Sequence, residues 1–531
     1  MRLALSKPSF QARSVHMETR FDFKDIFVLD LANNHQGDVE HGLNIIRQHG
    51  AILKARQVRG AIKFQFRQLE SFVHPDHKIG SANKHIPRFL DTQLDRTAFQ
   101  TLLDEVRAQR LIAICTPFDE NSVDVIVDMG FDVLKVASCS ATDWPLLEAI
   151  AATGKPVIFS TGGLELSQID DMKSFFDHRG VDHAIMHCVS IYPTPDRQCN
   201  LNNVTMLRER YPTSVIGWST HEDPADTGPV MIAAAKGARM FERHVGLATD
   251  KIMLNAYSST PEQIDAWIGA WQKTHNLCGS YDRLPPTPEE RDAIAGLQRG
   301  VFAREPVEKN EILTRDHVYF AMPLTEGQLS SGHWKPGITA RGSIPANGAV
   351  MVEATEIPLS PPIQVLKHAV HEVKALLNLA RVPLNSEFEV EYSHHYGICN
   401  FLETGVVIIN CINREYCKKI LVQLPNQSHP THYHRRKEET FQILWGMLHT
   451  ELDGRRRVLS PGDTQLVMPG IWHRFWSDTG CVFEEVSTTH FNDDSVYRDP
   501  AINKLDRAKR KTIVDHWGRF QLPGIVGKPT A

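Results

Sequence analysis

The sequence predicts an α/β protein in which a (β/α)8 (TIM) barrel is followed by a small β-rich domain and a C-terminal all-β barrel. Three observations predict this fold class. The first half of the 531-residue chain contains eight short, continuous apolar runs, as buried parallel strands do. Helix-compatible segments separate most neighbouring runs. The second half changes to short apolar pieces divided by Pro and Gly turn signals.

The eight apolar runs are the expected strands of the first barrel, with helices between them, for example over 95–110 and 121–129. Each run ends in polar, reactive residues, and in a parallel barrel the carboxyl ends of the strands surround one site. A doubly wound open sheet is the alternative, and it would also bring these residues to one cleft. The expected strands are residues 26–31, 61–64, 111–115, 133–137, 156–159, 183–187, 214–218 and 238–241.

Pro-rich breaks at 285–288 and 358–362 divide the rest of the chain. Apolar residues at helical spacing from Val365 to Leu377 predict a packing helix after the second break. Strand-like runs then follow, with an Asp453-Gly454 hairpin turn among them. The expected segments are a flexible N-terminal tail (1–20), the barrel (21–285), a linker helix and β-rich domain (286–358), a connecting helix (359–387), the all-β barrel (388–502) and a C-terminal tail (503–531).

Composition excludes several classes of partner. The formal net charge is −5, and no stripe of Lys and Arg with interleaved aromatic residues occurs, so no nucleic-acid partner is expected. No apolar stretch approaches the roughly 18 residues that span a bilayer, so no membrane partner is expected. The nine cysteines form no CxxC pair. We therefore expect a reduced, cytoplasmic protein.

Two histidines lie at the ends of the seventh and eighth expected strands, which are neighbours in a closed barrel. Neutral imidazoles from His221 and His244 could hold a divalent metal and leave coordination positions open for water or substrate. A single histidine is more often structural, so the prediction depends on the paired placement.

Two lysines, Lys63 and Lys135, lie within expected strands, where a lysine is normally excluded. Among the strand residues, Asp30 and Glu242 are the evident carboxylates that could pair with them. Two ammonium groups near several hydroxyls suit a phosphate, because many donors must converge on its oxygens. An internal salt bridge is the alternative. The hydroxyls at the strand ends belong to Thr116, Ser138, Ser160 and Ser219.

Four motifs resemble, in order and spacing, those of the sialic acid synthase family. They are DLANNHQGD at 30–38, HCVSIYPTP at 187–195, STH at 219–221 and FERH at 241–244. The similarity runs over about residues 24–358, and residues 299–356 resemble the antifreeze-like (SAF) domain of that family. The resemblance thus covers both architecture and motifs.

The resemblance implies condensation of phosphoenolpyruvate with an unphosphorylated, open-chain N-acyl amino sugar, with N-acetylmannosamine as the first expected acceptor. A manganese or similar ion would polarise the aldehyde. The methylene carbon of phosphoenolpyruvate would attack it, water would add, and phosphate would leave with C–O cleavage. Synthesis of legionaminic, pseudaminic or a deaminated acid is the alternative in the same class. The resemblance also implies a homodimer, in which the small β-rich domain covers the partner's barrel mouth.

The resemblance assigns a role to each matching residue. Asp30 occupies the position of the catalytic glutamate, and His35 would belong to the catalytic group with it. His35 and Asn34 also shape the same loop. His221 and His244 would bind the metal, while Gln65 and Tyr192 would contact the sugar and Tyr192 would also belong to the catalytic group. The expected phosphoenolpyruvate ligands are Lys63, Thr116, Lys135, Ser138, Ser160 and Ser219, and Ser190 and Glu242 complete the expected substrate-binding set.

The chain departs from the family pattern at several positions. Asp30 is one methylene shorter than the usual glutamate, and Ser190 stands where many members carry asparagine. Ser140 and Asn255 replace acidic residues that contact the acceptor, and Met322 lies near the position of an arginine of the antifreeze-like domain. Most of these changes concern the acceptor, so the resemblance specifies the reaction class more closely than the sugar.

A second candidate site lies in the C-terminal barrel. His432 and His434 form an HxH sequence, and residues i and i+2 of a strand face the same side. Glu439 and His473, from neighbouring strands, would complete a set of three histidines and one carboxylate. Such a set suits Mn, Fe, Ni or Zn.

This spacing resembles the cupin superfamily, and the surrounding residues are similar to sugar isomerases of the D-lyxose isomerase type. Trp445, Trp472 and Trp476 could stack on a sugar ring or pack in the core. The cupin would then isomerise, epimerise or bind the sugar that the first barrel uses or makes. Three alternatives stay open: an architectural cupin, a cupin isomerase with a non-catalytic first barrel, and a sugar sensor without chemistry.

Overall fold

The computed structural model describes residues 20–281, 283–359, 361–384 and 389–515. The chain forms two compact units that divide between Leu284 and Pro285. Among the described residues, no helix is both long enough and apolar enough to cross a membrane.

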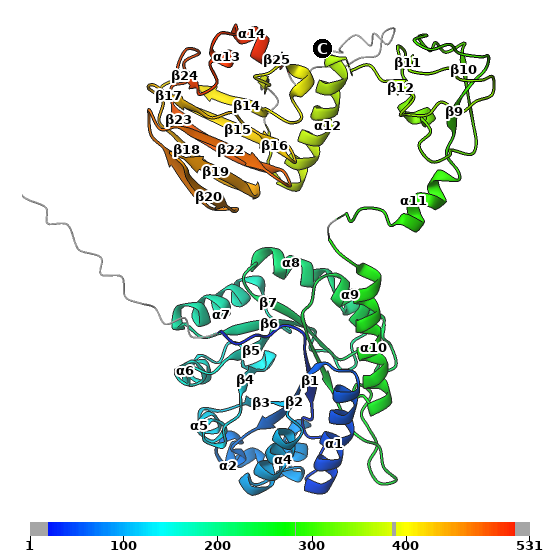
Figure 1. The fold of residues 1–531 in the computed structure, drawn as a ribbon. Coiled ribbons are helices and arrows are strands. Elements are labelled where there is room, and N and C mark those ends of the chain that lie inside the picture. Colours follow the sequence, from blue (N-terminus) through cyan, green and yellow to red (C-terminus); the bar gives the residue numbers. More distant parts are fainter. Residues whose placement is uncertain (1–19, 282, 360, 385–388, 516–531) are drawn as a thin grey trace, which may run out of the picture. The chain divides into compact units, whose positions relative to one another are not determined.

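The first unit is a closed parallel barrel of eight strands in sequential order (Figure 1). This confirms the predicted (β/α)8 fold and excludes the open sheet. Six of the eight strands extend past the predicted carboxyl end, so several of the polar residues belong to the strands themselves. The strands are β1 (Ile26–Asp30), β2 (Arg59–Phe66), β3 (Ile112–Pro117), β4 (Val133–Val136), β5 (Val157–Ser160), β6 (His183–Cys188), β7 (Val215–Thr220) and β8 (Met240–His244).

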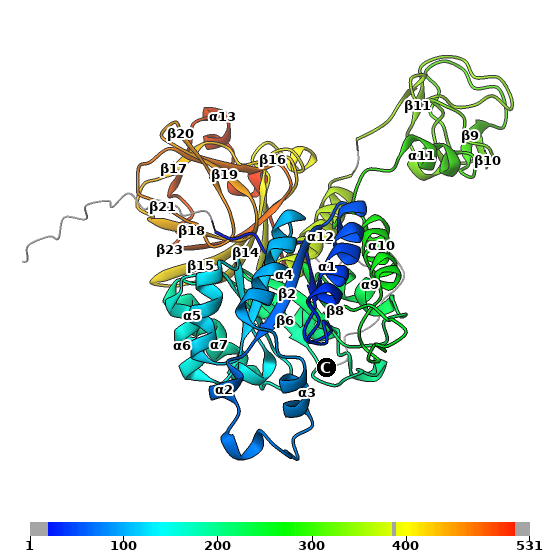
Figure 2. The same cartoon turned by 90° about the horizontal axis from the view of Figure 1, so that it is seen from below.

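Helices surround the ring of strands, as Figures 1 and 2 show. The first of them, α1, begins where the Asp38 side chain accepts a hydrogen bond from the His41 amide, and it buries Leu43, Ile46 and Leu53 against the strands. The helices are α1 (Val39–Ala55), α4 (Arg96–Ala108), α5 (Glu120–Met129), α6 (Trp144–Ala152), α7 (Leu166–Arg179), α8 (Asn202–Arg210), α9 (Gly228–Ala235) and α10 (Pro261–Cys278), with the short α2 (Leu69–Phe72) and α3 (His85–Asp91) after β2.

The interior of the barrel changes from apolar to charged along its axis. Side chains alternate along a strand, so every second residue points inward. On β1, Ile26 and Val28 belong to the apolar cluster inside the barrel, and Asp30 is the next residue in this alternation. On β8, Met240 and then Glu242 follow the same pattern. Charged groups therefore gather at the carboxyl ends of the strands, where barrel enzymes place their chemistry.

The second unit begins with the helix α11 (Pro288–Ala295) and a small β-rich domain with its own apolar core, which includes Val301, Leu313 and Val350. The domain contains the antiparallel pairs β9 (Gly300–Ala303) with β10 (Val318–Ala321) and β11 (Thr339–Ala340) with β12 (Thr355–Glu356). Its likeness to an antifreeze-like domain stays a prediction.

The helix α12 (Pro362–Leu379) packs on the C-terminal domain, to which it contributes an apolar face (Figure 1). All seven apolar residues that predicted this helix are buried: Val365, Leu366, Ala369, Val370, Val373, Leu376 and Leu377.

The C-terminal domain consists of antiparallel sheets, which confirms the predicted all-β architecture. Asp453 and Gly454 both have positive φ and join β19 to β20, as the hairpin signal predicted. One sheet has the order β21-β18-β23-β15-β14-β13-β25 and the other β20-β19-β22-β17-β24. The strands are β13 (Glu389–Ser393), β14 (Val406–Asn413), β15 (Tyr416–Gln423), β16 (Gln427–Ser428), β17 (His432–His434), β18 (Glu439–Gly446), β19 (Leu448–Leu452), β20 (Arg455–Leu459), β21 (Thr464–Val467), β22 (His473–Ser477), β23 (Cys481–Thr488), β24 (Ser495–Tyr497) and β25 (Lys511–Asp515).

The chain after Asn503 differs from the predicted tail over the residues that the structure describes. The helix α14 (Arg507–Arg510) is followed by β25, which pairs antiparallel with β13. The buried Glu391 of β13 gives the physical reason: its carboxylate lies 2.7 Å from Lys511 Nζ and 3.4 Å from Arg507 Nη2. The domain therefore continues to Asp515, and residues 516–531 lie outside the described residues.

Candidate active site and metal centre

Four buried charged residues form a network inside the first barrel. Lys63 Nζ lies 2.9 Å from Asp30 Oδ2 and 3.0 Å from Glu242 Oε1. Lys135 Nζ lies 3.0 Å from Glu242 Oε2 and donates a hydrogen bond of 2.8 Å to Ser160 Oγ. The Ser219 hydroxyl donates to Glu242 at 3.1 Å. Strands β1, β2, β4, β5, β7 and β8 thus converge on one cluster.

The structure thus shows the alternative given for the two lysines: both form ion pairs with carboxylates inside the barrel. Burial by itself would raise the pKa of the Glu242 carboxyl, but Lys135 and Lys63 hold it well below its usual range. Burial would likewise lower the pKa of Lys63, yet Asp30 and Glu242 raise it above the ordinary value. Lys63 and Glu242 are therefore ionised at neutral pH. Burial lowers the pKa of Lys135 from its ordinary value, while contact with Glu242 opposes this shift.

The Asp30 carboxylate contacts several of the predicted site residues. Besides Lys63, its Oδ2 atom accepts a hydrogen bond of 3.4 Å from Gln65 Nε2 and lies 3.5 Å from His244 Nδ1. The Ala32 amide donates to its other oxygen at 3.0 Å. Burial opposes ionisation, but Lys63 and His244 lower the pKa of Asp30. The carboxylate is thus available as a base or for orienting water, and it is not a proton donor at neutral pH.

The two barrel histidines lie side by side, with ring centroids 5.4 Å apart. His221 Nδ1 lies 2.9 Å from the Val189 carbonyl, to which it can only donate, so Nε2 carries the lone pair. Burial and the neighbouring His244 lower the pKa of His221 to about 3. Burial also lowers the pKa of His244. Two neutral imidazoles, with the Nε2 lone pair of His221 available, fit a divalent cation that keeps open positions.

Two tyrosines form an aromatic wall beside the histidines. The ring of Tyr192 lies 4.1 Å from that of His221 and 5.2 Å from that of Tyr257, which in turn lies 5.2 Å from His244. The sequence predicted Tyr192 but not Tyr257, which follows no expected strand and matches none of the quoted motifs.

A small polar cradle surrounds Gly162, after β5. The Gly162 amide donates to Ser138 Oγ at 3.0 Å. A Cβ atom at this position would lie 2.2 Å from Ser190 Oγ and 2.8 Å from Ser138 Oγ, so only glycine keeps the two hydroxyls converging there. Thr116, at the end of β3, has a buried hydroxyl without a hydrogen-bond partner. Such unsatisfied and converging donors suit the oxygens of an anion.

His35 lies in the loop between β1 and α1, and burial together with repulsion from His41 and Arg88 lowers its pKa to about 4. Its Nδ1 accepts from the Gly37 amide at 3.1 Å, and Asn34 donates to the Val245 carbonyl at 2.7 Å. Both therefore hold the β1–α1 loop in place. A pocket opens beside the loop and is lined by Asn33, His35, Gln65, Arg67, Leu69, Phe89, Thr92, Gln93, Leu94 and Phe99.

The structure also places the residues at which the sequence departs from the family pattern. Asn255 Nδ2 donates to Asn34 Oδ1 at 3.5 Å, and Ser140 is buried after β4. Met322 is 54% exposed on the small β-rich domain. Met322 therefore does not belong to the core of that domain.

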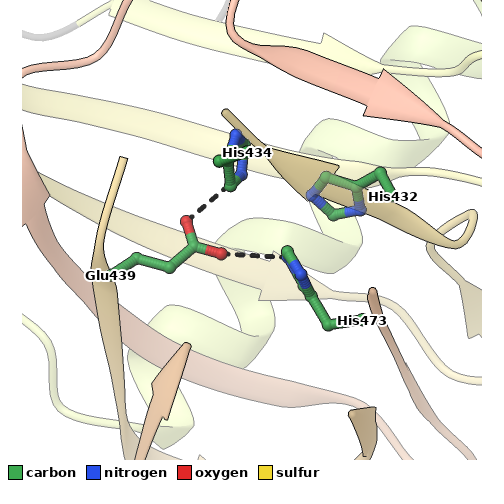
Figure 3. Close-up of side chains that lie close together, drawn as sticks. All are labelled: His432, His434, Glu439 and His473. Carbon is green, nitrogen blue, oxygen red and sulfur yellow. Dashed lines mark ion pairs between the residues drawn. The ribbon is translucent and has the colours of Figure 1, made fainter. Parts of the chain in front are cut away.

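The C-terminal barrel brings the four predicted metal ligands together (Figure 3). His432, His434, Glu439 and His473 are all buried, and their ligand atoms lie within 4.8 Å of one another. Glu439 Oε2 lies 3.4 Å from His434 Nε2, and Oε1 lies 3.0 Å from His473 Nε2. Among the residues that the structure describes, this is the group of three or more His, Cys, Asp or Glu with such a convergence.

Backbone carbonyls orient two of the three imidazoles. His432 Nδ1 lies 3.1 Å from the Pro430 carbonyl, and His473 Nδ1 lies 3.0 Å from the Ile471 carbonyl. These contacts place the proton on Nδ1 and the lone pair on Nε2, as a metal requires. His473 Nε2 faces Glu439 Oε1 at 3.0 Å, and burial lowers the pKa of His434 to about 4. The donor set fits a divalent transition metal.

The three tryptophans of the cupin have protein partners. Trp476 stacks on His449 at 5.1 Å, Trp472 contacts Tyr433 at 4.7 Å, and Trp445 packs against the apolar core. These contacts account for all three rings by packing.

Comparison with known proteins identifies both parts of the chain. The NeuB family model matches residues 53–283, and the cupin domain model matches residues 420–484. An uncharacterized protein of Methanocaldococcus jannaschii is 31% identical over 294 residues, which span 55% of this chain and 82% of that protein. Human N-acetylneuraminate-9-phosphate synthase is 25% identical over 297 residues, 54% of this chain and 80% of the enzyme.

The solved structures include one named as spore coat polysaccharide biosynthesis protein E, from Chromobacterium violaceum. It is 43% identical, covers 63% of this chain and 100% of its own, and superposes with a TM-score of 0.60. The chain belongs to the NeuB family, and it carries a cupin domain after the NeuB part.

Proposed function

We propose that the barrel condenses phosphoenolpyruvate with an open-chain N-acyl amino sugar, giving a nonulosonic acid and phosphate. One observation carries this proposal. The Asp30 carboxylate contacts Lys63, His244 and Gln65. These residues suit an anion, a metal and a sugar, respectively, and all three surround the same candidate base. N-acetylmannosamine is the first acceptor to test, and the precursors of legionaminic or pseudaminic acid are the alternatives.

Lys63, Lys135 and the hydroxyls would hold phosphoenolpyruvate. The substrate carries its own negative charge, so both lysines could exchange part of their contact with Glu242 for substrate oxygens. The cradle around Gly162, with Ser138 and Ser190, and the unpaired Thr116 hydroxyl would supply further donors.

Asp30 would orient and deprotonate the attacking water, because its lowered pKa keeps it ionised. In the reaction, the methylene carbon of phosphoenolpyruvate bonds to the aldehyde carbon, a water oxygen adds at the neighbouring carbon, and the C–O bond to phosphate breaks. His221 and His244 would hold a divalent ion such as Mn²⁺, which supplies Lewis-acid polarisation of the aldehyde. Tyr192 and Gln65 would orient the sugar.

The cupin supports a second proposed activity, because its four metal ligands are already assembled. We propose that it holds Mn, Fe, Ni or Zn and binds or isomerises the sugar that the barrel uses or makes. Incubating the metal-loaded full chain with each candidate sugar and separating the products tests this. Absence of both binding and isomerisation for every sugar would contradict it.

The experiment for the barrel measures phosphate released from phosphoenolpyruvate by the full chain with Mn²⁺ and a panel of N-acyl hexosamines. We expect release that depends on the sugar, with one 2-keto acid formed per phosphate. Release without any sugar, or no release with all of them, would contradict the proposal. Arg47→Met is a control variant that should release phosphate at the wild-type rate, because Arg47 is a surface residue of α1 that pairs with Glu105.

A further inference from the structure

Arg67 follows the last residue of β2 and lines the pocket beside the catalytic loop. Its guanidinium carbon lies 4.1 Å from the centre of the Phe89 ring and 3.7 Å from that of Phe118. The two rings hold the planar group between them, and cation–π attraction favours this position. The side chain is thus oriented before any ligand binds.

Arg67 is connected to the proposed catalytic base. Its Nη2 donates to Gln65 Oε1 at 2.9 Å, and Gln65 Nε2 donates to Asp30 at 3.4 Å. A group held by Arg67 would therefore lie one side chain away from the Asp30 carboxylate. The sequence did not predict this residue, because it lies outside the quoted motifs.

The Arg67 guanidinium has the carboxylates of Asp30 and Asp119 in its surroundings, but neither forms a direct ion pair with it. No carboxylate of the described residues lies within 4.0 Å of its guanidinium, whereas the nearby Lys63 and Lys135 both pair with carboxylates. The Nε atom of Arg67 is buried without a hydrogen-bond partner. A buried donor without an acceptor is costly, and a ligand oxygen that accepts from this Nε–H would remove that cost.

The other walls of the pocket do not supply the missing anion. Their polar residues are Asn33, Gln65, Thr92, Gln93 and His35, and none is acidic. His35 is neutral at pH 7, since its pKa is about 4. The lining therefore carries a single positive charge, that of a guanidinium whose forked donors match the oxygens of a phosphate or a carboxylate.

We propose that Arg67 binds a phosphate or carboxylate group of a substrate in this pocket, beside Asp30. The inference rests on the proposed function and deepens it, because it names the charged group that the site recognises. Two sources of the group are possible: phosphoenolpyruvate itself, or an acceptor sugar that carries a phosphate or carboxylate.

Binding titrations of the full chain with Mn²⁺ separate these sources. Arg67→Met keeps the aliphatic stem and removes the charge and the donors, and Arg47→Met is the matched control. If phosphoenolpyruvate supplies the anion, its dissociation constant rises at least about tenfold in Arg67→Met. If the acceptor supplies it, phosphoenolpyruvate binding is unchanged, while N-acetylmannosamine 6-phosphate or a hexuronic acid binds at least about tenfold more weakly.

The proposal is overturned if Arg67→Met binds phosphoenolpyruvate and the charged sugars within twofold of the wild type, or if the wild type binds none of them. Should Arg67→Met fail to fold, Arg67→Lys provides the test. It keeps the charge without the fork, so the same ligand should bind more weakly at an unchanged unfolding midpoint. Binding without condensation would refute the proposed function while leaving the role of Arg67 in place.

Discussion

Asp30 is the residue on which the proposed chemistry depends most. Its side chain is short, and this raised the question of whether the carboxylate reaches the site. The structure places it 2.9 Å from Lys63, so the reach is sufficient for contact with the charged cluster. The shorter side chain therefore does not keep the carboxylate out of the cluster.

Asp30→Asn keeps the shape of the side chain and removes its charge. We expect sugar-dependent phosphate release to fall about 10²- to 10⁴-fold, because a general base contributes roughly this factor. Initial rates at saturating phosphoenolpyruvate check the prediction. Asp30→Glu is the companion variant and should retain measurable activity. Equal rates for the wild type and Asp30→Asn would remove Asp30 from the mechanism.

His473→Ala tests the cupin metal centre. The change removes one of four ligands, and we expect the metal content of the purified chain to fall by about one ion per chain, or its affinity by about 10- to 100-fold or more. His449→Ala is the control, since His449 lies on the same domain but stacks on Trp476. Elemental analysis measures both. Equal metal content in the wild type and in His473→Ala would contradict the assignment.

His49 makes stability depend on pH. It is fully buried in α1, with Nδ1 2.9 Å from the Ile45 carbonyl, and burial lowers its pKa from 6.5. Above pH 6.5 both the folded and the unfolded states hold it neutral, so its contribution is complete. Below that pH the unfolded state binds the proton first, and stability is lost by up to about 1.4 kcal/mol per pH unit.

The thermal unfolding midpoint of the metal-free chain should therefore decrease as the pH is lowered from about 7.5 to about 5.5. His49→Gln should show a shallower fall over the same interval. Parallel pH profiles for the two proteins would show that His49 does not contribute.

Sequence alone predicted which residues meet at the barrel site, but not how they pair. Inward-facing strand ends placed Lys63, Lys135 and Glu242 together because the alternation of side chains is local. The pairing depends on the distances between β2, β4 and β8 across the barrel interior, and no local pattern encodes them. Arg67 was missed for the same reason: its partners Phe89 and Phe118 come from two separate segments.

At the scale of the elements, continuous apolar runs predicted the barrel strands, and apolar residues at helical spacing predicted α12. Both patterns are local, because each depends on residues within one element. The strand β25 was missed. It is short and follows the basic segment Arg507–Arg510, which is typical of a solvated tail, and its partner β13 lies far back in the chain. Its assignment depends on the buried carboxylate of Glu391, which only the fold reveals.

Ending the chain after Leu505 should destabilise the cupin, because Glu391 would stay buried without Lys511 and Arg507. Breaking a buried ion pair costs about 3–5 kcal/mol, so the unfolding transition of the cupin should shift to lower temperature. Glu391→Gln in the shortened chain should recover part of the loss. The control ends after Asp515 and keeps β25. Identical unfolding of the two shortened chains would show that β25 does not stabilise the domain.

At the scale of the whole molecule, the chain combines two sites with separate ligand sets. The barrel site uses residues between Asp30 and His244, and the cupin metal centre uses residues between His432 and His473. Each set lies within one of the two compact units. Both sets could be read from the sequence because each belongs to one domain with its own motif. The dimer implied by family resemblance stays a prediction, since it concerns surfaces between chains.

The central claim is that condensation takes place in the barrel. Sugar-dependent phosphate release from phosphoenolpyruvate, compared between Asp30→Asn and the double variant His432→Ala/His434→Ala, tests it most directly. We expect Asp30→Asn to lose the activity and the cupin variant to keep phosphate release within about twofold of the wild type, because the two ligand sets share no residue. Loss of release in the cupin variant, with full activity in Asp30→Asn, would contradict the account and place the chemistry in the cupin.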